Sequence, residues 1–253
     1  MTQPPKRLRA KGLDRAFDVI ELLHEARGPK RPAEIATALG APKSTIYEIV
    51  GDLVARGLLE ATDDEGRVFL GRRLFFWGQA YIDSFDIAQK AGRKLREVTG
   101  ATKETTQFCM LDGNKYTVLM MQEGARPFRI SADVGVRTPI PWTASGRLLV
   151  GHLGDAEILD FIPEGDFRLP DGQSIDRGAF LAEVALAREQ DFFSFDSIVD
   201  NFTHCFAAPI RNEDRVCTAT LCIVAPKDDA TDRYATYRDL LQAASRDLSG
   251  GLF

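Results

Sequence analysis

Residues 31–60, RPAEIATALGAPKSTIYEIVGDLVARGLLE, contain two short helical patterns separated by a glycine and a proline. Apolar residues recur at helical spacing in the first pattern, which Gly40 ends. Pro42 opens the second pattern, because a residue in the first turn of a helix needs no N–H donor. The apolar positions of the first helix are Ile35, Ala36 and Leu39. The segment therefore predicts two short helices joined by a tight turn, the pattern of a helix-turn-helix.

The second helix, about Lys43 to Arg56, has one apolar and one polar face. The residues expected to be buried recur at spacings of three and four: Ile46, Ile49, Val50, Leu53 and Val54. Five others lie on the outer face near the start of the helix: Lys43, Ser44, Thr45, Tyr47 and Glu48. In a helix-turn-helix, that end of the second helix meets base edges in the major groove. We therefore expect these five residues to contact duplex DNA.

A short β-hairpin pattern follows the second helix. The expected elements around it are a helix over 13–26, strands over 58–61 and 67–70, and a turn over 63–66. Together they predict a winged helix-turn-helix domain over residues 1–71, with Arg67 of the wing touching the DNA backbone. Two short helices and a hairpin also occur in other α/β domains. Here the turn, the helix ends and the hairpin agree with one another, which favours the winged helix.

Charge is unevenly distributed along the chain. Residues 1–79 carry 13 Lys and Arg against 11 Asp and Glu, whereas residues 80–253 carry 19 against 26. A net charge of +2 is small for a DNA-binding domain, so the favourable charge must be local. A basic N-terminal arm supplies it, and its residues expected to contact DNA are Arg7, Arg9 and Lys11. Such arms reach phosphates or the minor groove.

The next segment, residues 72–86, is rich in aromatic residues. It is expected to form a linker helix on which one stripe gathers Leu74, Trp77, Tyr81 and Phe85. This apolar area exceeds what one helix edge usually hides. We expect it to pack against the same helix of a second copy, which would also present two recognition helices to a two-fold operator. The alternative is that these rings pack between the two domains of one chain.

Residues 87–253 predict a second domain with helices and an antiparallel sheet. A strong hairpin signal, Asp112-Gly113-Asn114, joins two of the expected strands. The expected helices are 87–99, 144–153, 175–190 and 234–248. The expected strands are 105–111, 116–122, 128–131, 205–210 and 216–225. In the helix over 175–190, Phe180, Val184 and Leu186 form the expected apolar face.

Several classes of protein are disfavoured by what the sequence lacks. It has no signal-peptide pattern and no apolar run long enough to span a bilayer, so we expect a cytoplasmic protein with no membrane partner. The four cysteines include no C-x-x-C pair and the three histidines do not cluster, which favours free thiols in a reducing compartment and no metal site.

Enzyme motifs are also missing. No phosphate-binding loop, serine-hydrolase elbow or zinc-protease motif occurs. His204 and Cys205, with Asp196 nearby, suggest a thiol hydrolase, but adjacent strand residues point to opposite faces, so His204 cannot serve Cys205 as a base. We therefore expect no enzyme activity, no catalytic residue and no cofactor.

Taken in order, these motifs resemble the IclR family of bacterial transcriptional regulators. The matching segments are GLDRAFDVIELL, LGAPKSTIYEIVGDLVARGLLE, GRVFLGRRL, GVRTPIPWTASGRLLVG and CFAAPI. The resemblance covers nearly the whole chain. It implies an α+β, two-domain fold with an N-terminal winged helix-turn-helix, a linker helix used in dimerisation, and a C-terminal effector-binding domain over 87–253. The sheet of that domain would be GAF- or PAS-like and bind a small metabolite.

The resemblance also implies where the effector binds. The family's pocket positions fall here on Thr143, Ala144, Ser145, Gly146, Phe195, Asp196, Cys205, Cys222 and Val224. Phe195, Cys222 and Val224 stand where the family usually has more polar residues, so a two-carbon acid would leave polar groups unpaired. The helix beginning near Thr143 favours a carboxylate. We therefore expect a larger organic acid with an aromatic or branched body.

Glu48 departs from the family pattern, which usually has a basic residue near this point of the recognition helix. A carboxylate cannot contact phosphate or guanine in the same way, but it can accept a hydrogen bond from a cytosine amino group.

The sequence therefore predicts a ligand-responsive, sequence-specific DNA-binding transcriptional regulator, a repressor or an activator, in a pathway of a small organic acid. Its expected partners are a duplex DNA operator, a carboxylate effector and further copies of itself, as a homodimer or a dimer of dimers. One alternative is an enzyme with a fused winged-helix contact domain. Another is a C-terminal domain that serves only in oligomerisation, which the small residues on the strands disfavour.

Overall fold

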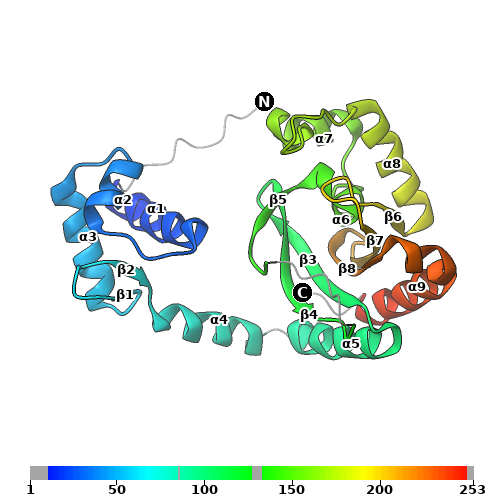
Figure 1. The fold of residues 1–253 in the computed structure, drawn as a ribbon, viewed down its shortest axis with the longest axis horizontal. Helices are drawn as coiled ribbons and strands as arrows, with labels where there is room; N and C mark the ends of the chain where they lie inside the picture. The colour runs from blue at the N-terminus through cyan, green and yellow to red at the C-terminus, as the bar shows by residue number, and fades with distance from the viewer. Residues whose placement is uncertain (1–10, 85, 127–132, 250–253) are drawn as a thin grey trace. The chain divides into compact units, whose positions relative to one another are not determined.

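The computed structural model describes residues 11–84, 86–126 and 133–249, and it separates into two compact units, residues 1–84 and 85–253 (Figure 1). The division falls inside the segment expected to be a linker. Arg7, Arg9, Phe85 and the strand expected over 128–131 lie outside the described residues.

The first unit is a winged helix-turn-helix, as the sequence predicts. Its elements are α1 (Lys11–Ala26), α2 (Pro32–Ala38), α3 (Lys43–Ala55), β1 (Leu59–Ala61), β2 (Val68–Leu70) and α4 (Arg72–Ser84). Gly40 adopts a φ of 59° in the turn between α2 and α3, a conformation that glycine adopts without steric cost. Strands β1 and β2 pair antiparallel from Leu59 opposite Leu70 to Ala61 opposite Val68.

The buried faces of this unit are narrower than expected. Helix α1 fully buries Val19 and Leu23, but Phe17 is exposed, because the helix meets α3 and β2 along one side only. In α3, Ile46, Val50 and Leu53 are buried. The expectation that Val54 is buried was wrong: it is 38% exposed, because it lies at the edge of the buried stripe, about 100° around the helix from Leu53.

The second unit is built on a six-stranded antiparallel sheet with the order β5-β4-β3-β8-β7-β6. The strands are β3 (Thr105–Asp112), β4 (Lys115–Gln122), β5 (Arg137–Pro139), β6 (Phe193–Asp196), β7 (Thr203–Arg211) and β8 (Cys217–Pro226). The helices are α5 (Asp86–Thr102), α6 (Ala144–Leu149), α7 (Asp155–Phe161), α8 (Arg177–Gln190) and α9 (Lys227–Leu248), with short 3-10 turns η1 (Ile140–Trp142) and η2 (Glu164–Phe167).

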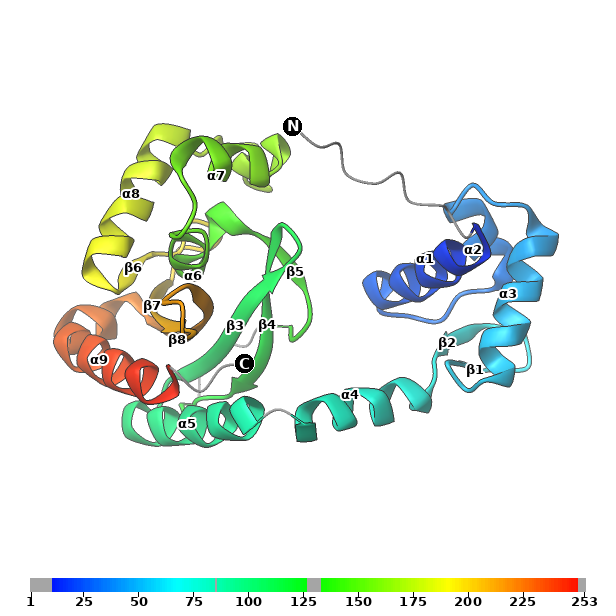
Figure 2. The ribbon, with the colours of Figure 1, turned by 180° about the vertical axis from the view of Figure 1, so that it is seen from behind.

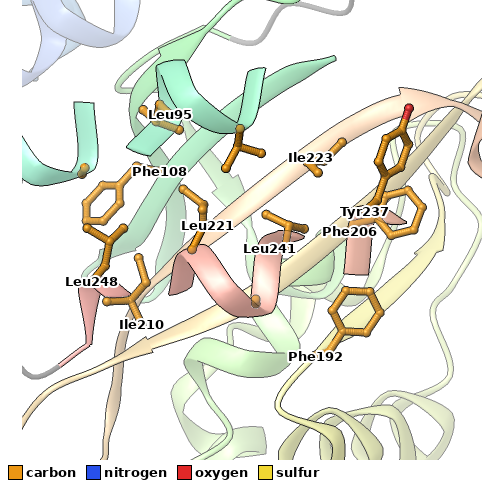
Figure 3. Close-up of a cluster of buried hydrophobic side chains, with 14 of the residues drawn as sticks. Leu95, Phe108, Phe192, Phe206, Ile210, Leu221, Ile223, Tyr237, Leu241 and Leu248 are labelled. Carbon is orange, nitrogen blue, oxygen red and sulfur yellow. The ribbon is translucent and has the colours of Figure 1, made fainter. Parts of the chain in front are cut away.

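The two faces of the central strands have different neighbours. Helices α5 and α9 cover one face, where a large apolar core gathers around Phe206, Leu221, Ile223, Tyr237 and Leu241 (Figure 3). Helix α6 packs on the other face against β7 and β8, as Figure 2 shows from behind. Side chains alternate between the two faces along each strand. Neighbouring residues of β8 therefore serve either the core or the opposite face.

Some of this unit was not expected from the sequence. Strands β5 and β6, helix α7 and both 3-10 turns are short elements with little periodicity. Helix α6 ends at Leu149, four residues earlier than expected, and α9 begins at Lys227, seven residues earlier. Phe180 and Val184 of α8 are buried as expected, but Leu186 is exposed, because only one side of α8 meets the rest of the unit.

Helix α6 is held against η1 by a close contact at Gly146. A Cβ added there would lie 2.1 Å from the carbonyl oxygen of Ile140, which is backbone and cannot swing aside. We therefore expect Gly146→Ala to lower the free energy of unfolding by at least about 2 kcal/mol, the scale of overpacked cores.

Gly100→Ala is the matched control, because Gly100 lies in α5 of the same unit with nothing within 4 Å of an added Cβ. It should raise the free energy of unfolding by up to about 1 kcal/mol, since alanine favours helix more than glycine does. Urea denaturation of both variants measures the difference. Equal stabilities would show that the Gly146 contact does not constrain α6.

Candidate functional site

The described residues of the winged-helix unit leave the outer face of α3 exposed to solvent. Tyr47 is 55% exposed, Lys43, Ser44 and Glu48 are exposed as well, and Thr45 is half-buried. The first turn of α3 contains no acidic residue. The five residues expected to contact DNA are therefore placed together on one end of the recognition helix.

In the wing, acidic residues lie beside Arg67, the residue expected to touch the DNA backbone. Arg67 forms ion pairs with Asp63 and Glu65, each with an N–O distance of 2.9 Å, and Arg31 also pairs with Glu65. The backbone N–H of Arg67 and its guanidinium hold the pKa of Asp63 below its ordinary value, although burial opposes this. The guanidinium of Arg67 is thus already shared between two carboxylates, which compete with a phosphate for its donors.

The basic arm and the linker helix are only partly described. Lys11 is the first residue of α1, but its side chain lies outside the described residues, as does that of Tyr81 in α4. Leu74 packs, half-buried, against the core of the winged-helix unit. Trp77 is exposed and lies under the guanidinium of Arg73, whose carbon is 6.0 Å from the ring centre.

The second unit contains a cavity of about 250 Å³ on the α6 side of the sheet. Six of the nine residues expected to bind an effector line it: Thr143, Ala144, Ser145, Cys205, Cys222 and Val224. The register of the sheet explains this grouping, because Cys205 pairs with Val224 and Ala207 with Cys222 across β7 and β8. These strand residues share one face and meet the start of α6.

Gly146 and Asp196 do not line the cavity. The N–H of Gly146 donates to Thr143 Oγ1 at 3.0 Å and its Cα packs on Ile140, so its role is to close the helix start. Asp196 points to the opposite face, where it accepts a hydrogen bond from His204 Nδ1 at 2.8 Å and pairs with Lys227 at 3.5 Å.

Phe195 is also outside the lining. It pairs with Cys205 and shares its face, but its ring lies against the buried guanidinium of Arg147, 4.6 Å from the ring centre to the guanidinium carbon. Phe202, which precedes β7 in the chain, is 66% exposed and does not line the cavity either.

Other lining residues were not found from the sequence. Gln107, Tyr116 and Val118 come from β3 and β4, and strand alternation places them on the same face as Cys222. The alternation along these strands is visible in the sequence, but it assigns the residues to the cavity only once the pairing of β3 with β4 and β8 is known. The other lining residues are Asp133, Val136, Ser197 and Asp200 from loops, Thr138 from β5, Trp142 from η1, and Thr203 and Phe206 from β7. Loops carry no periodic pattern that would identify their residues.

The polar groups of the cavity are mostly committed to neighbours. Tyr116 Oη shares its one hydrogen between Gln107 Oε1, at 3.3 Å, and Cys109 Sγ, at 2.9 Å, and burial raises the pKa of Tyr116 well above its ordinary value. Trp142 Nε1 donates to the Asp166 carbonyl at 3.0 Å, so its ring offers the cavity an apolar surface.

The charged residues of the described lining are acidic. Asp200 accepts hydrogen bonds from the backbone N–H groups of Phe202 and Thr203 and from Thr203 Oγ1, at 2.9, 2.8 and 2.7 Å. Burial acts to raise the pKa of Asp200, but these bonds outweigh it and the pKa is lowered. Asp133 also lines the cavity, whereas no Lys or Arg of the described residues does.

Comparison with known proteins bears on both units. The family model described as the IclR helix-turn-helix domain matches residues 12–63, and the model described as bacterial transcriptional regulator IclR C-terminal matches residues 79–250. The chain belongs to the IclR family. It is a ligand-responsive, DNA-binding transcriptional regulator, and the alternative of an enzyme is set aside because this family consists of regulators.

Relatives of known role are similar over almost their full length. XynR, an HTH-type transcriptional regulator of Escherichia coli K12, is 27% identical over 244 residues, which are 95% of this chain and 96% of XynR. AllR, an HTH-type transcriptional repressor of the same strain, is 24% identical over 257 residues, 99% of this chain and 93% of AllR.

Solved structures of this family share the fold. The IclR regulator from Alicyclobacillus acidocaldarius gives a TM-score of 0.84 at 18% identity, covering 95% of this chain and 98% of that one. An IclR homologue from Microbacterium hydrocarbonoxydans, solved in complex with 4-hydroxybenzoate, gives 0.79 at 25% identity, covering 94% and 97%. Among the described residues of the present IclR protein, no helix is both long and apolar enough to cross a membrane.

Proposed function

We propose that this IclR-family protein controls a pathway of a small organic acid, and that the cavity beside α6 binds that acid as its effector. The cavity carries the proposal: it holds about 250 Å³ and combines apolar walls, among them Val118, Val136 and Val224, with a small number of polar groups. That combination is typical of small-molecule sites.

The polar groups suit a ligand with one negative charge. Thr143 Oγ1 accepts the N–H of Gly146, and the N–H groups of Ala144 and Ser145 remain at the start of α6, where a carboxylate is favoured. Asp133 and Asp200 would repel a second carboxylate. The proposed effector is therefore a monoacid.

The body of the acid should be aromatic or branched. Cys205, Cys222 and Val224 form a wall with few donors, which satisfies a ring better than the polar groups of a two-carbon oxo-acid. The Microbacterium hydrocarbonoxydans homologue solved with 4-hydroxybenzoate supports this class of effector.

Calorimetry should show binding of 4-hydroxybenzoate and weaker or no binding of glyoxylate. Val224→Trp should reduce hydroxybenzoate affinity at least about tenfold, since the indole fills the cavity. Leu119→Trp is the control, because Leu119 is an exposed residue of β4 and its substitution should leave affinity unchanged. Tight binding of glyoxylate alone would reject the proposed effector class.

For DNA, we propose that Lys43, Ser44, Thr45, Tyr47 and Glu48 divide base and phosphate contacts, with Arg7, Arg9 and Lys11 of the arm reaching phosphates or the minor groove. Exposure of the outer face of α3 supports this assignment. Glu48 is proposed to read a cytosine amino group. Arg67 is proposed to contact the backbone after leaving Asp63 and Glu65.

Glu48→Ala should relax discrimination at one base position by about 1–3 kcal/mol, the cost of a lost base contact. Arg67→Ala should instead weaken binding to all sequences alike, because phosphate contacts carry no base information. Competition binding against a library of near-palindromic duplexes measures both. A base-specific effect of Arg67→Ala, or a uniform effect of Glu48→Ala, would contradict the assigned roles.

We also propose that the chain forms a homodimer, or a dimer of dimers, through α4. Phe75, Phe76 and Trp77 are exposed on this helix, and Phe17 is exposed on α1 of the same unit. Large aromatic residues dominate interface energies when they are desolvated. A dimer would also match a two-fold operator.

The double variant Trp77→Ala, Tyr81→Ala should weaken self-association, measured by sedimentation equilibrium, at least about tenfold. Leu159→Ala, Leu186→Ala is the control, because it removes two exposed leucines from α7 and α8 and should leave association unchanged. An unaltered assembly of the aromatic variant would exclude α4 as the principal contact.

A further inference from the structure

Cys222 is the point at which two chains of hydrogen-bond donors meet. Ser145 Oγ lies 2.8 Å from Cys222 Sγ, and Ser145 itself accepts a hydrogen bond from Thr220 Oγ1 at 2.8 Å, which leaves its own hydrogen for the sulfur. On the other side, Tyr116 Oη shares its one hydrogen between Cys109 Sγ, at 2.9 Å, and Gln107 Oε1, at 3.3 Å, and Cys109 Sγ lies 3.9 Å from Cys222 Sγ. Donors that converge on one sulfur stabilise its thiolate.

The other thiols of the chain are placed differently. Burial raises the pKa of Cys205 to about 12 and that of Cys217 to about 12, and it raises the pKa of Cys109 well above its ordinary value. The hydrogen bond from Cys109 lowers the pKa of Cys222, against the effect of burial and with further help from Ser145. Of the four thiols, Cys222 is therefore the first to ionise.

Gln107 stands directly beside this sulfur. It is the register partner of Cys222 across β3 and β8, so the two side chains lie on one face with Cβ atoms about 5 Å apart. Gln107 is only 5% exposed, and its Oε1 accepts from Tyr116. Within the described part of the chain its Nε2 has no hydrogen-bond partner, yet it belongs to the cavity lining. A donor that faces the cavity without a protein partner favours an acceptor atom on a ligand.

We propose that Cys222 is a covalent capture site for α,β-unsaturated carbonyl compounds that enter the cavity. Such a compound has an electrophilic β-carbon, which a nucleophilic sulfur attacks, and a carbonyl oxygen, which accepts a hydrogen bond from an N–H donor. The carbonyl oxygen accepts from Gln107 Nε2, and the β-carbon faces Cys222 Sγ. The proposal rests on the cavity being the effector site, but it does not depend on which acid binds there reversibly.

The reaction needs no other reagent. The sulfur electron pair forms the S–C bond at the β-carbon, and the π pair of the C=C bond moves toward the carbonyl, where Gln107 Nε2 stabilises the developing charge on oxygen. The proton that leaves the Cys222 thiol is returned to the α-carbon through solvent. The product is a saturated thioether, with atoms and electrons balanced. The thioether adduct would occupy the cavity and, unlike a reversibly bound effector, would not dissociate.

N-ethylmaleimide, a cyclic α,β-unsaturated carbonyl compound, tests the proposal on the folded, full-length protein. One equivalent at neutral pH should give a single adduct by intact mass, placed on Cys222 by peptide mapping, at least about tenfold faster than glutathione reacts. Cys222→Ser should lose this adduct. Cys217→Ser is the matched control, because Cys217 is a buried cysteine of the same strand that does not line the cavity, and this variant should keep the adduct and its rate.

A second pair of variants separates the two functional groups. Gln107→Leu should slow the maleimide at least about tenfold but leave the rate with methyl methanethiosulfonate, which has no carbonyl, within about twofold. Ser145→Ala should slow both reagents. Thermal melts check that the variants are folded.

A first adduct on another cysteine, or none on folded protein whose denatured form takes four labels, would overturn the proposal. These readouts need neither DNA nor reversible ligand, so a failure of hydroxybenzoate to bind remains a separate result.

Discussion

The antiparallel pairing of β7 with β8 is the constraint on which the effector unit depends. A single register directs Leu221 and Ile223 into the core beneath α5 and α9, and it directs Cys222 and Val224 into the cavity. Because side chains alternate with a period of two, a shift of one residue would exchange the two sets. The same backbone hydrogen bonds therefore determine both the stability of this unit and the chemistry of its cavity.

Much of this arrangement could be predicted from the sequence, because turn residues and apolar periodicity determine local structure in the fold as well. Gly40 and Pro42 mark the turn between the two short helices, and the apolar spacing of α3 gives its buried face. Alternation along β8 puts Cys222 and Val224 on one face, and both line the cavity. Each of these inferences needs only the chain neighbours of a residue.

The rest depends on contacts distant in sequence. Phe195 lies on the expected face, but β6 is the edge strand and Arg147 covers the ring there. Asp196, one residue later, faces the other side of the sheet. Gln107 could be assigned to the cavity only once β3 was known to pair with β8. In the wing, nothing local shows that Arg67 divides its guanidinium between Asp63 and Glu65.

The contact between Gly146 and the Ile140 carbonyl bears on how such regulators diversify. It is a contact of backbone against backbone, so no choice of neighbouring side chain can relieve a larger residue at position 146. Within this fold, a larger residue at position 146 would therefore force the backbone at the start of α6 to move. Strand positions such as Val224, and the surface loop that carries Asp200, are free of this restriction. If the cavity binds the effector as proposed, new effector specificities should arise by substitution at those positions while α6 stays in place.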